Sequence, residues 1–232
     1  ILELPLVVID VQRAGPSTGL PTKPEQSDLN IAYYGRHGEA PIPIVAASGA
    51  ADCFAMTIEA ARIALKYMTP VILLSDGYMA QGTEPWRIPD MSELPDLSVN
   101  FATDPETFKP YRRDPETLAR MWAVPGTPNL EHRIGGLEKE DITGLVSHDP
   151  LNHQKMVELR QKKIDGIVND IPLAEVEGEQ SGDLLVVAWG SVYGPVKTAF
   201  DSLREQGHKI SYTHLKYIRP FPKNLVEILS RF

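Results

Sequence analysis

The chain has 232 residues, of which 42% are hydrophobic, so it can form one large or two ordinary domains and is not generally disordered. Its formal net charge of −8 argues against nucleic-acid binding, because nucleic acids select basic surfaces. No apolar run approaches membrane-spanning length, no signal peptide precedes the first strand, and the single cysteine allows no internal disulfide. We therefore expect a cytoplasmic protein without a membrane partner. Because the chain begins at Ile1 rather than Met, we expect a fragment.

An apolar, β-branched run over residues 4–10, closed by Gly and Pro, predicts a buried strand that ends in a loop. That loop, residues 12–28, is called the signature loop below. Because it follows a strand, it should lie at the carboxyl end of a sheet, where open α/β sheets bind ligands. Gly15 and Gly19 leave room for a ligand close to the backbone.

The side chains of the signature loop suit an anionic ligand. The guanidinium of Arg13 can bind a carboxylate or phosphate through two parallel hydrogen bonds, and the hydroxyls of Ser17, Thr18 and Thr22 can hold the remaining oxygens. The glycine spacing matches neither a Walker loop nor a dinucleotide-binding fingerprint. The simpler interpretation is a Pro/Gly turn that carries a solvated surface arginine.

The next segments have the pattern of a βαβ unit. Residues 42–47 and 71–75 read as strands, and the second is short and wholly apolar, as in parallel sheets buried on both faces. Between them a helix is expected, capped by Asp52 or Ser48. Its apolar positions repeat at helical spacing: Phe54, Ile58, Ala61 and Leu65. This half of the chain is therefore expected to be α/β.

Residues 88–150 contain eight prolines and no sustained period, which is long for a connection inside a compact domain. The segment is either a disordered linker or an ordered, irregular excursion over a neighbouring surface. The second is favoured by a set of apolar anchors: Trp86, Phe101, Phe108, Tyr111, Trp122 and Leu130. A helix is then expected from a cap at Asn152 to about Asn169.

The remaining residues predict a second α/β unit. Residues 175–183 are acidic and contain glycine, as a hinge would. A buried strand is expected over residues 184–189, then a helix that Gly207 stops, a strand over residues 209–215 and a final helix from Leu225.

Several strings extend the pattern of the signature loop. Residues 12–22 read Gln-Arg-x-Gly-Pro-Ser-Thr-Gly-x-Pro-Thr, and further matching strings lie at residues 34–41, 122–128, 131–133 and 188–191. Together they closely resemble the α subunits of the thiamine-diphosphate-dependent 2-oxoacid:ferredoxin oxidoreductases, in particular those that use 2-oxoglutarate. The resemblance spans nearly the whole chain.

The resemblance implies a domain organisation. Residues 1–87 correspond to the later part of a pyrimidine-type thiamine-diphosphate-binding α/β domain. Residues 88–182 hold the irregular excursion, a helix and a linker. Residues 183–232 correspond to the start of a transketolase C-terminal-like α/β domain, so that both domains are expected to be incomplete.

The resemblance also implies an activity. Members of this family oxidatively decarboxylate 2-oxoglutarate to succinyl-CoA, with coenzyme A as co-substrate, and pass the electrons to ferredoxin. The α subunit works only in a heterodimer with a β subunit, which is expected to carry most of the thiamine diphosphate site, its Mg²⁺ and a [4Fe-4S] cluster. Consistent with this division, the chain has no Gly-Asp-Gly magnesium motif and no cysteine cluster.

Site residues follow from the matched positions. Arg13 matches the arginine that pairs with the oxoacid carboxylate, and Thr22 matches the threonine that assists it; Ser17 and Thr18 are further substrate-binding candidates. No catalytic residue and no metal ligand is assigned. Secondary candidates are Lys23, Gln26, Arg36 and His37, while His132 and Arg133 could serve substrate, coenzyme A or the subunit interface.

Other functions stay open from the sequence. The same family could act here on pyruvate or a branched 2-oxoacid. The chain could instead be a non-catalytic, partner-binding scaffold that docks through its excursion and its acidic surface. A free-standing module for sugar or nucleotide phosphates would rest only on the hydroxyl-rich loop.

Overall fold

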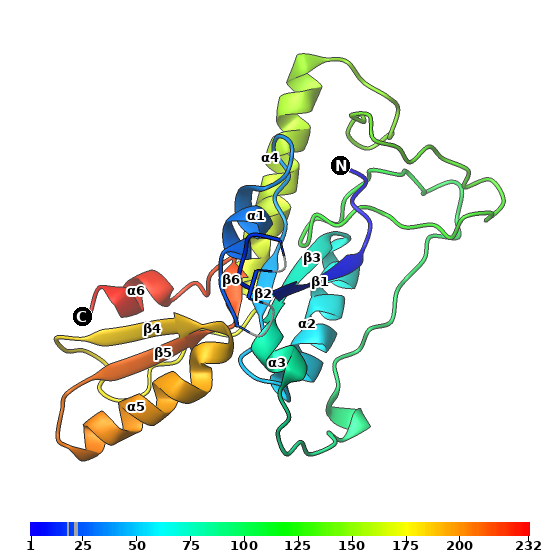
Figure 1. Ribbon diagram of the computed structural model, residues 1–232. Coiled ribbons are helices and arrows are strands. Elements are labelled where there is room, and N and C mark those ends of the chain that lie inside the picture. The colour runs from blue at the N-terminus through cyan, green and yellow to red at the C-terminus, as the bar shows by residue number, and fades with distance from the viewer. Residues whose placement is uncertain (18, 21–22) are drawn as a thin grey trace.

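The computed structural model describes residues 1–17, 19–20 and 23–232, which form two sheets with surrounding helices (Figure 1). The larger sheet has four strands in the order β1-β3-β2-β6, and the smaller pairs β4 with β5. The strands are β1 (Leu6–Gln12), β2 (Ile44–Ala46), β3 (Pro70–Asp76), β4 (Leu185–Trp189), β5 (Ser211–Leu215) and β6 (Tyr217–Arg219).

Six α-helices accompany the sheets: α1 (Asp28–Tyr34), α2 (Asp52–Tyr67), α3 (Gly77–Gln81), α4 (Pro150–Gly166), α5 (Tyr193–Glu205) and α6 (Leu225–Leu229). In Figure 1 the irregular segment between α3 and α4 runs along the side that carries α2 and the N terminus, whereas β4, β5, α5 and α6 lie on the opposite side. Within the described ranges, no helix is long and apolar enough to cross a membrane.

The larger sheet is covered on both faces, as its alternating side chains show. Val71 and Leu73 of β3 belong to the cluster that contains α2 and the end of α4, whereas Leu74 belongs to the opposite cluster with Ala32 of α1 and Ile218 of β6. Successive side chains of a strand point to opposite faces, so the apolar residues of β3 are buried on both. The expectation of a buried parallel strand at this position is confirmed.

β1 departs from the prediction of a buried strand. It forms at the expected place, but Leu6 and Ile9 are 57% and 54% exposed. The reason is its position at the edge of the sheet, where it pairs only with β3 among the described strands. An apolar run predicts a strand well, but it does not tell whether neighbouring elements cover that strand in this chain.

Two helix caps also differ from the prediction. Neither Ser48 nor Asp52 is the N-cap of α2; the carboxylate of Asp52 instead accepts hydrogen bonds from the backbone N and Oγ of Ser48, at 2.9 and 2.8 Å. Asn152 does not cap α4, because Asp149 accepts a hydrogen bond from Leu151 N and Pro150 opens the helix.

The apolar residues from which the sequence predicted α2 are not the ones that this helix buries against the sheet. The side chains buried against the sheet are Met56, Ala60, Ile63, Ala64 and Tyr67, not the four that the helical spacing singled out. Phe54, one of those four, instead contacts Trp86 with ring centroids 5.2 Å apart. Both faces of α2 are therefore used, one by the sheet and one by the start of the excursion.

The excursion, residues 88–149, is irregular but ordered through its own contacts. Phe108, Ala123 and Leu130 form a small buried cluster, and isolated backbone bridges pair Tyr111 with Ile142 and Arg113 with Arg120. Of the expected anchors, Tyr111 is 1% exposed, while Trp86 and Phe101 are 47% and 42% exposed. The structure thus favours the ordered alternative over a disordered linker.

The C-terminal part is joined to the larger sheet by an element that the sequence did not suggest. β4 and β5 are parallel, as a βαβ unit requires, and Gly207 follows α5 with a φ of +89°. β4 is only partly buried, contrary to prediction, because its sheet has just two strands. β6 then crosses over to pair antiparallel with β2. The domain boundaries inferred from the resemblance stay a prediction.

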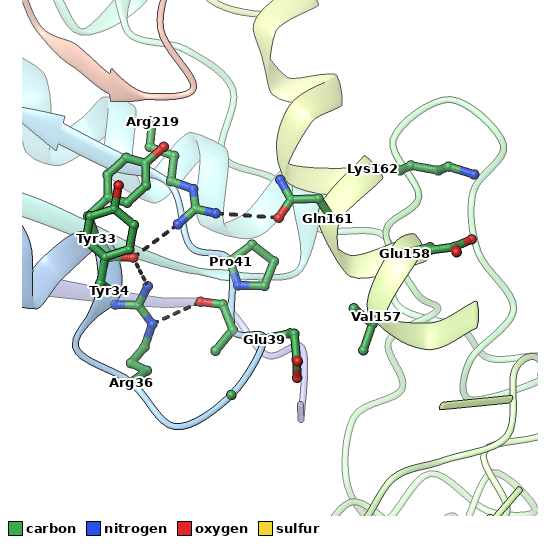
Figure 2. A pocket seen from close by; sticks show the side chains of 12 residues that line it. Tyr33, Tyr34, Arg36, Glu39, Pro41, Val157, Glu158, Gln161, Lys162 and Arg219 are labelled. Atoms are coloured by element: carbon green, nitrogen blue, oxygen red, sulfur yellow. Dashed lines mark hydrogen bonds between the residues drawn. The ribbon is translucent and has the colours of Figure 1, made fainter. Parts of the chain in front are cut away.

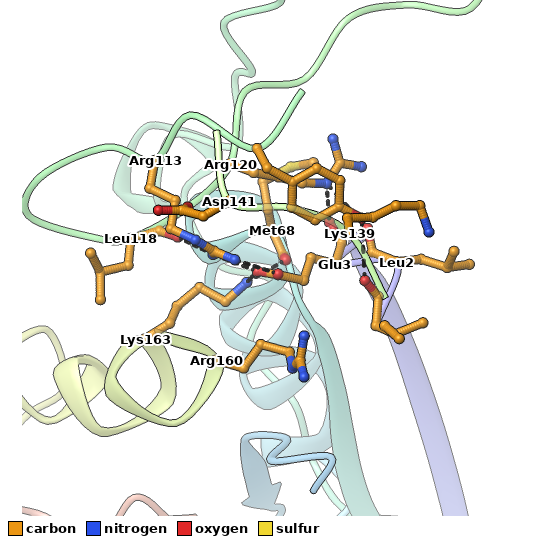
Figure 3. Close-up of polar contacts among 12 residues, drawn as sticks. Leu2, Glu3, Met68, Arg113, Leu118, Arg120, Lys139, Asp141, Arg160 and Lys163 are labelled. Carbon is orange, nitrogen blue, oxygen red and sulfur yellow. Dashed lines mark hydrogen bonds and ion pairs between the residues drawn. The ribbon is translucent and has the colours of Figure 1, made fainter. Parts of the chain in front are cut away.

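A buried ionic cluster fastens the N-terminal segment to the excursion and to α4 (Figure 3). Glu3 is 5% exposed and accepts hydrogen bonds from Arg113, with Nη2 2.7 Å from Oε1, and from Lys163. Arg120 Nε lies 3.1 Å from the carbonyl oxygens of Leu2 and Glu3. Burial alone would raise the pKa of Glu3, but Lys163 and Arg113 outweigh it and lower that pKa to about 2.

Replacing Glu3 by Gln should strongly destabilise the protein, because Lys163 and Arg113 would be left buried without a counter-charge. A loss of about 3 to 5 kcal/mol is expected in chemical unfolding of the full-length subunit. The Glu3 carboxylate contributes its full stability above its unfolded pKa, near 4.5, and loses it as the pH falls towards 2, so the two proteins should converge in acid.

The matched control is Glu227→Gln, because Glu227 pairs with Arg231 on the surface of α6 with a side chain that is 67% exposed. It should change stability by less than about 1 kcal/mol. Equal effects of the two substitutions would contradict a structural role for the buried cluster.

Candidate functional site

Three parallel strands place their carboxyl ends at one edge of the larger sheet. Gln12 at the end of β1 lies in register with Asp76 at the end of β3, and Ala46 at the end of β2 lies in register with Leu74. The residues that follow these strands therefore gather at one edge, called the carboxyl edge below. Open α/β sheets bind ligands at such an edge.

Polar side chains hold the carboxyl edge from within. Gln12 is 2% exposed, and its Nε2 donates to the carbonyl of Ser75 at 3.0 Å, which joins the ends of β1 and β3. Asp76 Oδ1 accepts from the backbone N of Tyr78 and Met79, at 2.9 and 3.0 Å, and so caps α3. The other oxygen of Asp76 accepts from the hydroxyl of Ser191, in the turn after β4.

The signature loop leaves this edge and folds back on itself. Ala14 N donates to Lys23 O at 3.1 Å, and Gly15 N donates to the carboxylate of Glu25 at 2.8 Å. Gly19 has a φ of +36°, and a Cβ placed there would lie 2.0 Å from the carbonyl oxygen of Ala14. Only glycine fits this position, so the loop needs it to close.

A long-range contact ties the signature loop to the C-terminal part. Gln26 Nε2 donates to the carbonyl oxygen of Trp189 at 3.0 Å, across 163 residues of sequence. Gly190 follows with a φ of +74°, and a Cβ there would lie 3.0 Å from the same nitrogen. The side chain of Gln26 therefore supports the loop.

The structure describes some of the predicted substrate-binding residues. Arg13 follows directly after β1, and its exposed side chain makes no hydrogen bond or ion pair with another described residue. Ser17 and Lys23 are exposed on the same loop, whereas Thr18 and Thr22 lie outside the described residues. Whether these side chains bind a substrate stays a prediction.

Arg36 and His37 lie in a different place. The guanidinium of Arg36 donates to three backbone carbonyl oxygens, those of Ala32, Tyr33 and Ala40, at 2.5 to 3.1 Å. Figure 2 shows the bonds to Tyr33 and Ala40. Burial and the nearby charge of Arg219 lower its pKa. These contacts hold the turn after α1, while His37 is exposed.

Figure 2 also shows the cavity that Arg36 lines, with a volume of about 470 Å³. Its walls come from residues 33–41, from α4 and from Arg219, which lies over the ring of Tyr33 at 4.5 Å. No residue of the signature loop lines it among those described. The structure therefore does not bring Arg36 together with Arg13.

His132 and Arg133 lie in the excursion. The His132 ring packs on Phe108 with centroids 5.1 Å apart, and its Nδ1 lies 2.8 Å from the carbonyl oxygen of Leu130. Both residues line a surface cavity of the excursion. This arrangement does not choose between the roles that the sequence left open.

Sequence reasoning missed the side chains that hold the carboxyl edge, namely Asp76, Ser191 and Glu25. A usable signal was present for two of them, because Asp76 ends one apolar strand and Ser191 follows another. The string at residues 188–191, which contains Ser191, was used only as evidence of the family resemblance. For Glu25 no local pattern announces a bond to Gly15.

The described residues offer hydrogen-bonding groups rather than metal ligands. Among those residues, there is no group of three or more His, Cys, Asp or Glu side chains that could bind a metal ion. Cys53 is half-buried, and burial raises the pKa of its thiol. The thiol lies 3.9 Å from the hydroxyl of Ser75.

Comparison with protein-family models assigns most of the chain. Residues 1–148 match the model described as pyruvate flavodoxin/ferredoxin oxidoreductase, thiamine diphosphate-binding, and residues 182–231 match pyruvate:ferredoxin oxidoreductase core domain II. The chain therefore belongs to the pyruvate flavodoxin/ferredoxin oxidoreductase family. This confirms the expected fold class, a thiamine-diphosphate-binding α/β domain followed by a second α/β domain.

Individual relatives narrow the comparison. The chain is 56% identical to 2-oxoglutarate oxidoreductase subunit KorA of Mycobacterium tuberculosis over 99% of its own length and 35% of that protein. It is 34% identical to subunit alpha of 2-oxoacid:ferredoxin oxidoreductase 1 of Aeropyrum pernix, over 99% of this chain and 36% of the relative. The chain thus spans about a third of the length of these relatives.

A solved structure resembles this chain over nearly its whole length. The 2-oxoglutarate:ferredoxin oxidoreductase from Magnetococcus marinus, with 2-oxoglutarate, coenzyme A and succinyl-CoA bound, matches with a TM-score of 0.88 and 36% identity. The match covers 99% of this chain and 40% of that one.

Replacing Gly19 by Ala should open the signature loop, because the new Cβ would clash with the carbonyl oxygen of Ala14 at a backbone conformation that alanine disfavours. Amide hydrogen exchange at Ala14 and Lys23, whose backbone hydrogen bonds close the loop, should speed up by about 10-fold or more. Gly15→Ala is the control, since a Cβ there meets nothing within 4 Å. Unchanged exchange in Gly19→Ala would show that the loop closes differently.

Proposed function

We propose that this chain is part of the α subunit of a 2-oxoglutarate:ferredoxin oxidoreductase, and that it binds the carboxylate of the 2-oxoacid through Arg13. The enzyme oxidatively decarboxylates 2-oxoglutarate to succinyl-CoA, with coenzyme A as co-substrate and ferredoxin as electron acceptor. The observation that carries the proposal is the exposed guanidinium of Arg13, which has no partner among the described residues and follows directly after a strand end at the carboxyl edge of a thiamine-diphosphate-binding fold.

The contrast with other arginines supports this role. Arg113 and Arg160 form ion pairs with Glu3 and Glu138, and Arg36 is used by backbone carbonyls. Arg13 has no such partner among the described residues. An exposed guanidinium suits a carboxylate, which it can bind with two parallel hydrogen bonds, and Ser17 is exposed on the same loop.

The choice of 2-oxoglutarate rests on the relatives. Proteins named for 2-oxoglutarate include the 56% identical subunit and the structural neighbour, whereas a 34% identical relative is named only for 2-oxoacids. Pyruvate and branched 2-oxoacids are the competing substrates. A non-catalytic scaffold is the alternative of another class, and it predicts that loss of Arg13 leaves turnover unchanged.

The cofactors are divided between subunits in this proposal. Thiamine diphosphate supplies the electron sink that decarboxylation of a 2-oxoacid needs. A [4Fe-4S] cluster is held by four thiolate ligands, and these 232 residues supply one cysteine. Following the family resemblance, we place the cluster, together with Mg²⁺, on a partner β subunit. This chain's own residues bind and orient the oxoacid. The single cysteine and the redox partner fit the cytoplasm.

Arg13→Ala in the full-length α subunit, assembled with its partner, should raise the KM for 2-oxoglutarate. Loss of a charge-assisted pair is worth about 1.5 to 3 kcal/mol, or roughly 10- to 150-fold in KM. The measurement is 2-oxoglutarate- and coenzyme A-dependent reduction of a viologen dye over a range of substrate concentrations.

The control is Arg87→Ala, which removes an exposed arginine on the segment after α3 and should leave the KM unchanged. An unchanged KM in Arg13→Ala would refute carboxylate recognition by this residue. If the unaltered enzyme turned over pyruvate but not 2-oxoglutarate, the family assignment would stand and the proposed substrate would be wrong.

A further inference from the structure

The signature loop is fixed at both of its ends, but by different parts of the chain. At its start, the ladder of β1 with β3 and the bond from Gln12 to Ser75 hold the main chain just before Arg13. At its end, Gln26 is held by the carbonyl of Trp189, which ends β4 in the other sheet. The two ends of the loop are therefore held by different sheets.

The turn at residues 189–191 is built to present that carbonyl. Gly190 adopts a positive φ of +74°, which turns the chain sharply after β4. A side chain at Gly190 would come within 3.0 Å of Gln26 Nε2 and push it away. The string Ala-Trp-Gly-Ser at this turn also contributed to the family resemblance.

The same turn makes a second, independent contact with the carboxyl edge. Ser191 Oγ donates to the carboxylate of Asp76, whose other oxygen caps α3. Asp76 is 3% exposed and lies in register with Gln12, next to Arg13. The turn thus contacts the carboxyl edge through Asp76 and the far end of the loop through Gln26.

We propose that Gln26 is a positioning residue for the 2-oxoacid: by its hydrogen bond to Trp189 it holds the signature loop in the conformation in which Arg13 meets the substrate carboxylate. The inference rests on the proposed function of Arg13 and adds to it that the second α/β unit takes part in substrate recognition. Gln26 itself does not have to touch the substrate.

The test uses the full-length α subunit assembled with its partner and the viologen assay. Gln26→Glu keeps the size of the side chain but replaces the donor by a charged acceptor, which the carbonyl of Trp189 repels. We expect the KM for 2-oxoglutarate to rise about 3- to 10-fold, with kcat within about twofold of the unaltered enzyme. Gln26→Met, which lacks both the donor and the charge, should raise the KM in the same direction. Asn30→Ala, at an exposed amide on α1, is the control and should change neither constant.

A double-mutant cycle with Arg13 separates positioning from a general structural role. If Gln26 acts through Arg13, adding Gln26→Glu to Arg13→Ala should not raise the KM further, since the group that was positioned is gone. Multiplying effects in the double mutant, or an unchanged KM in both Gln26 variants, would overturn the proposal while leaving Arg13 in its role. An unchanged KM in Arg13→Ala alone would instead overturn the proposed function, and the positioning role with it.

Discussion

The site depends on the register between β1 and β3. Because Gln12 pairs with Asp76, the residue that leaves β1 and the residue that caps α3 lie side by side, and everything at the carboxyl edge is placed relative to this pair. The register is set on one side only, since β1 is an edge strand in the described chain. The bond from Gln12 to Ser75 therefore strengthens the end of a ladder that has no second neighbour.

The buried charged residues stabilise a different part of the fold. Glu3, Arg113 and Lys163 meet far from the carboxyl edge, at the opposite end of β1 and β3, where the N-terminal segment, the excursion and α4 come together (Figure 3). An irregular segment of about sixty residues cannot rely on ladder hydrogen bonds, so side-chain contacts of this kind must fix it to the rest. Within the part of the chain that the structure describes, no ion pair involves Arg13.

The sequence predicted the elements whose signal is local. Wholly apolar runs identified β1 and β3, and helical spacing identified α2 and α5. The sequence did not predict the features that depend on which elements pack against each other. Tertiary neighbours determine the burial of β1, the side of α2 that faces the sheet and the crossover of β6. The N-cap of α4 is Asp149 rather than Asn152, because Pro150 favours the first position of a helix.

The same limit applies to the site. The composition of the signature loop pointed to an anion, and its string pointed to a family, but neither indicated that a carbonyl 163 residues away holds Gln26. Such a contact has no local signature, because backbone carbonyls are present at every residue; only the positive φ of Gly190 makes this one available. Residues that place a binding group are thus harder to find in a sequence than the group itself. Here the carbonyl that holds Gln26 belongs to the second sheet, so the proposed positioning of Arg13 would depend on how the second α/β unit packs against the first.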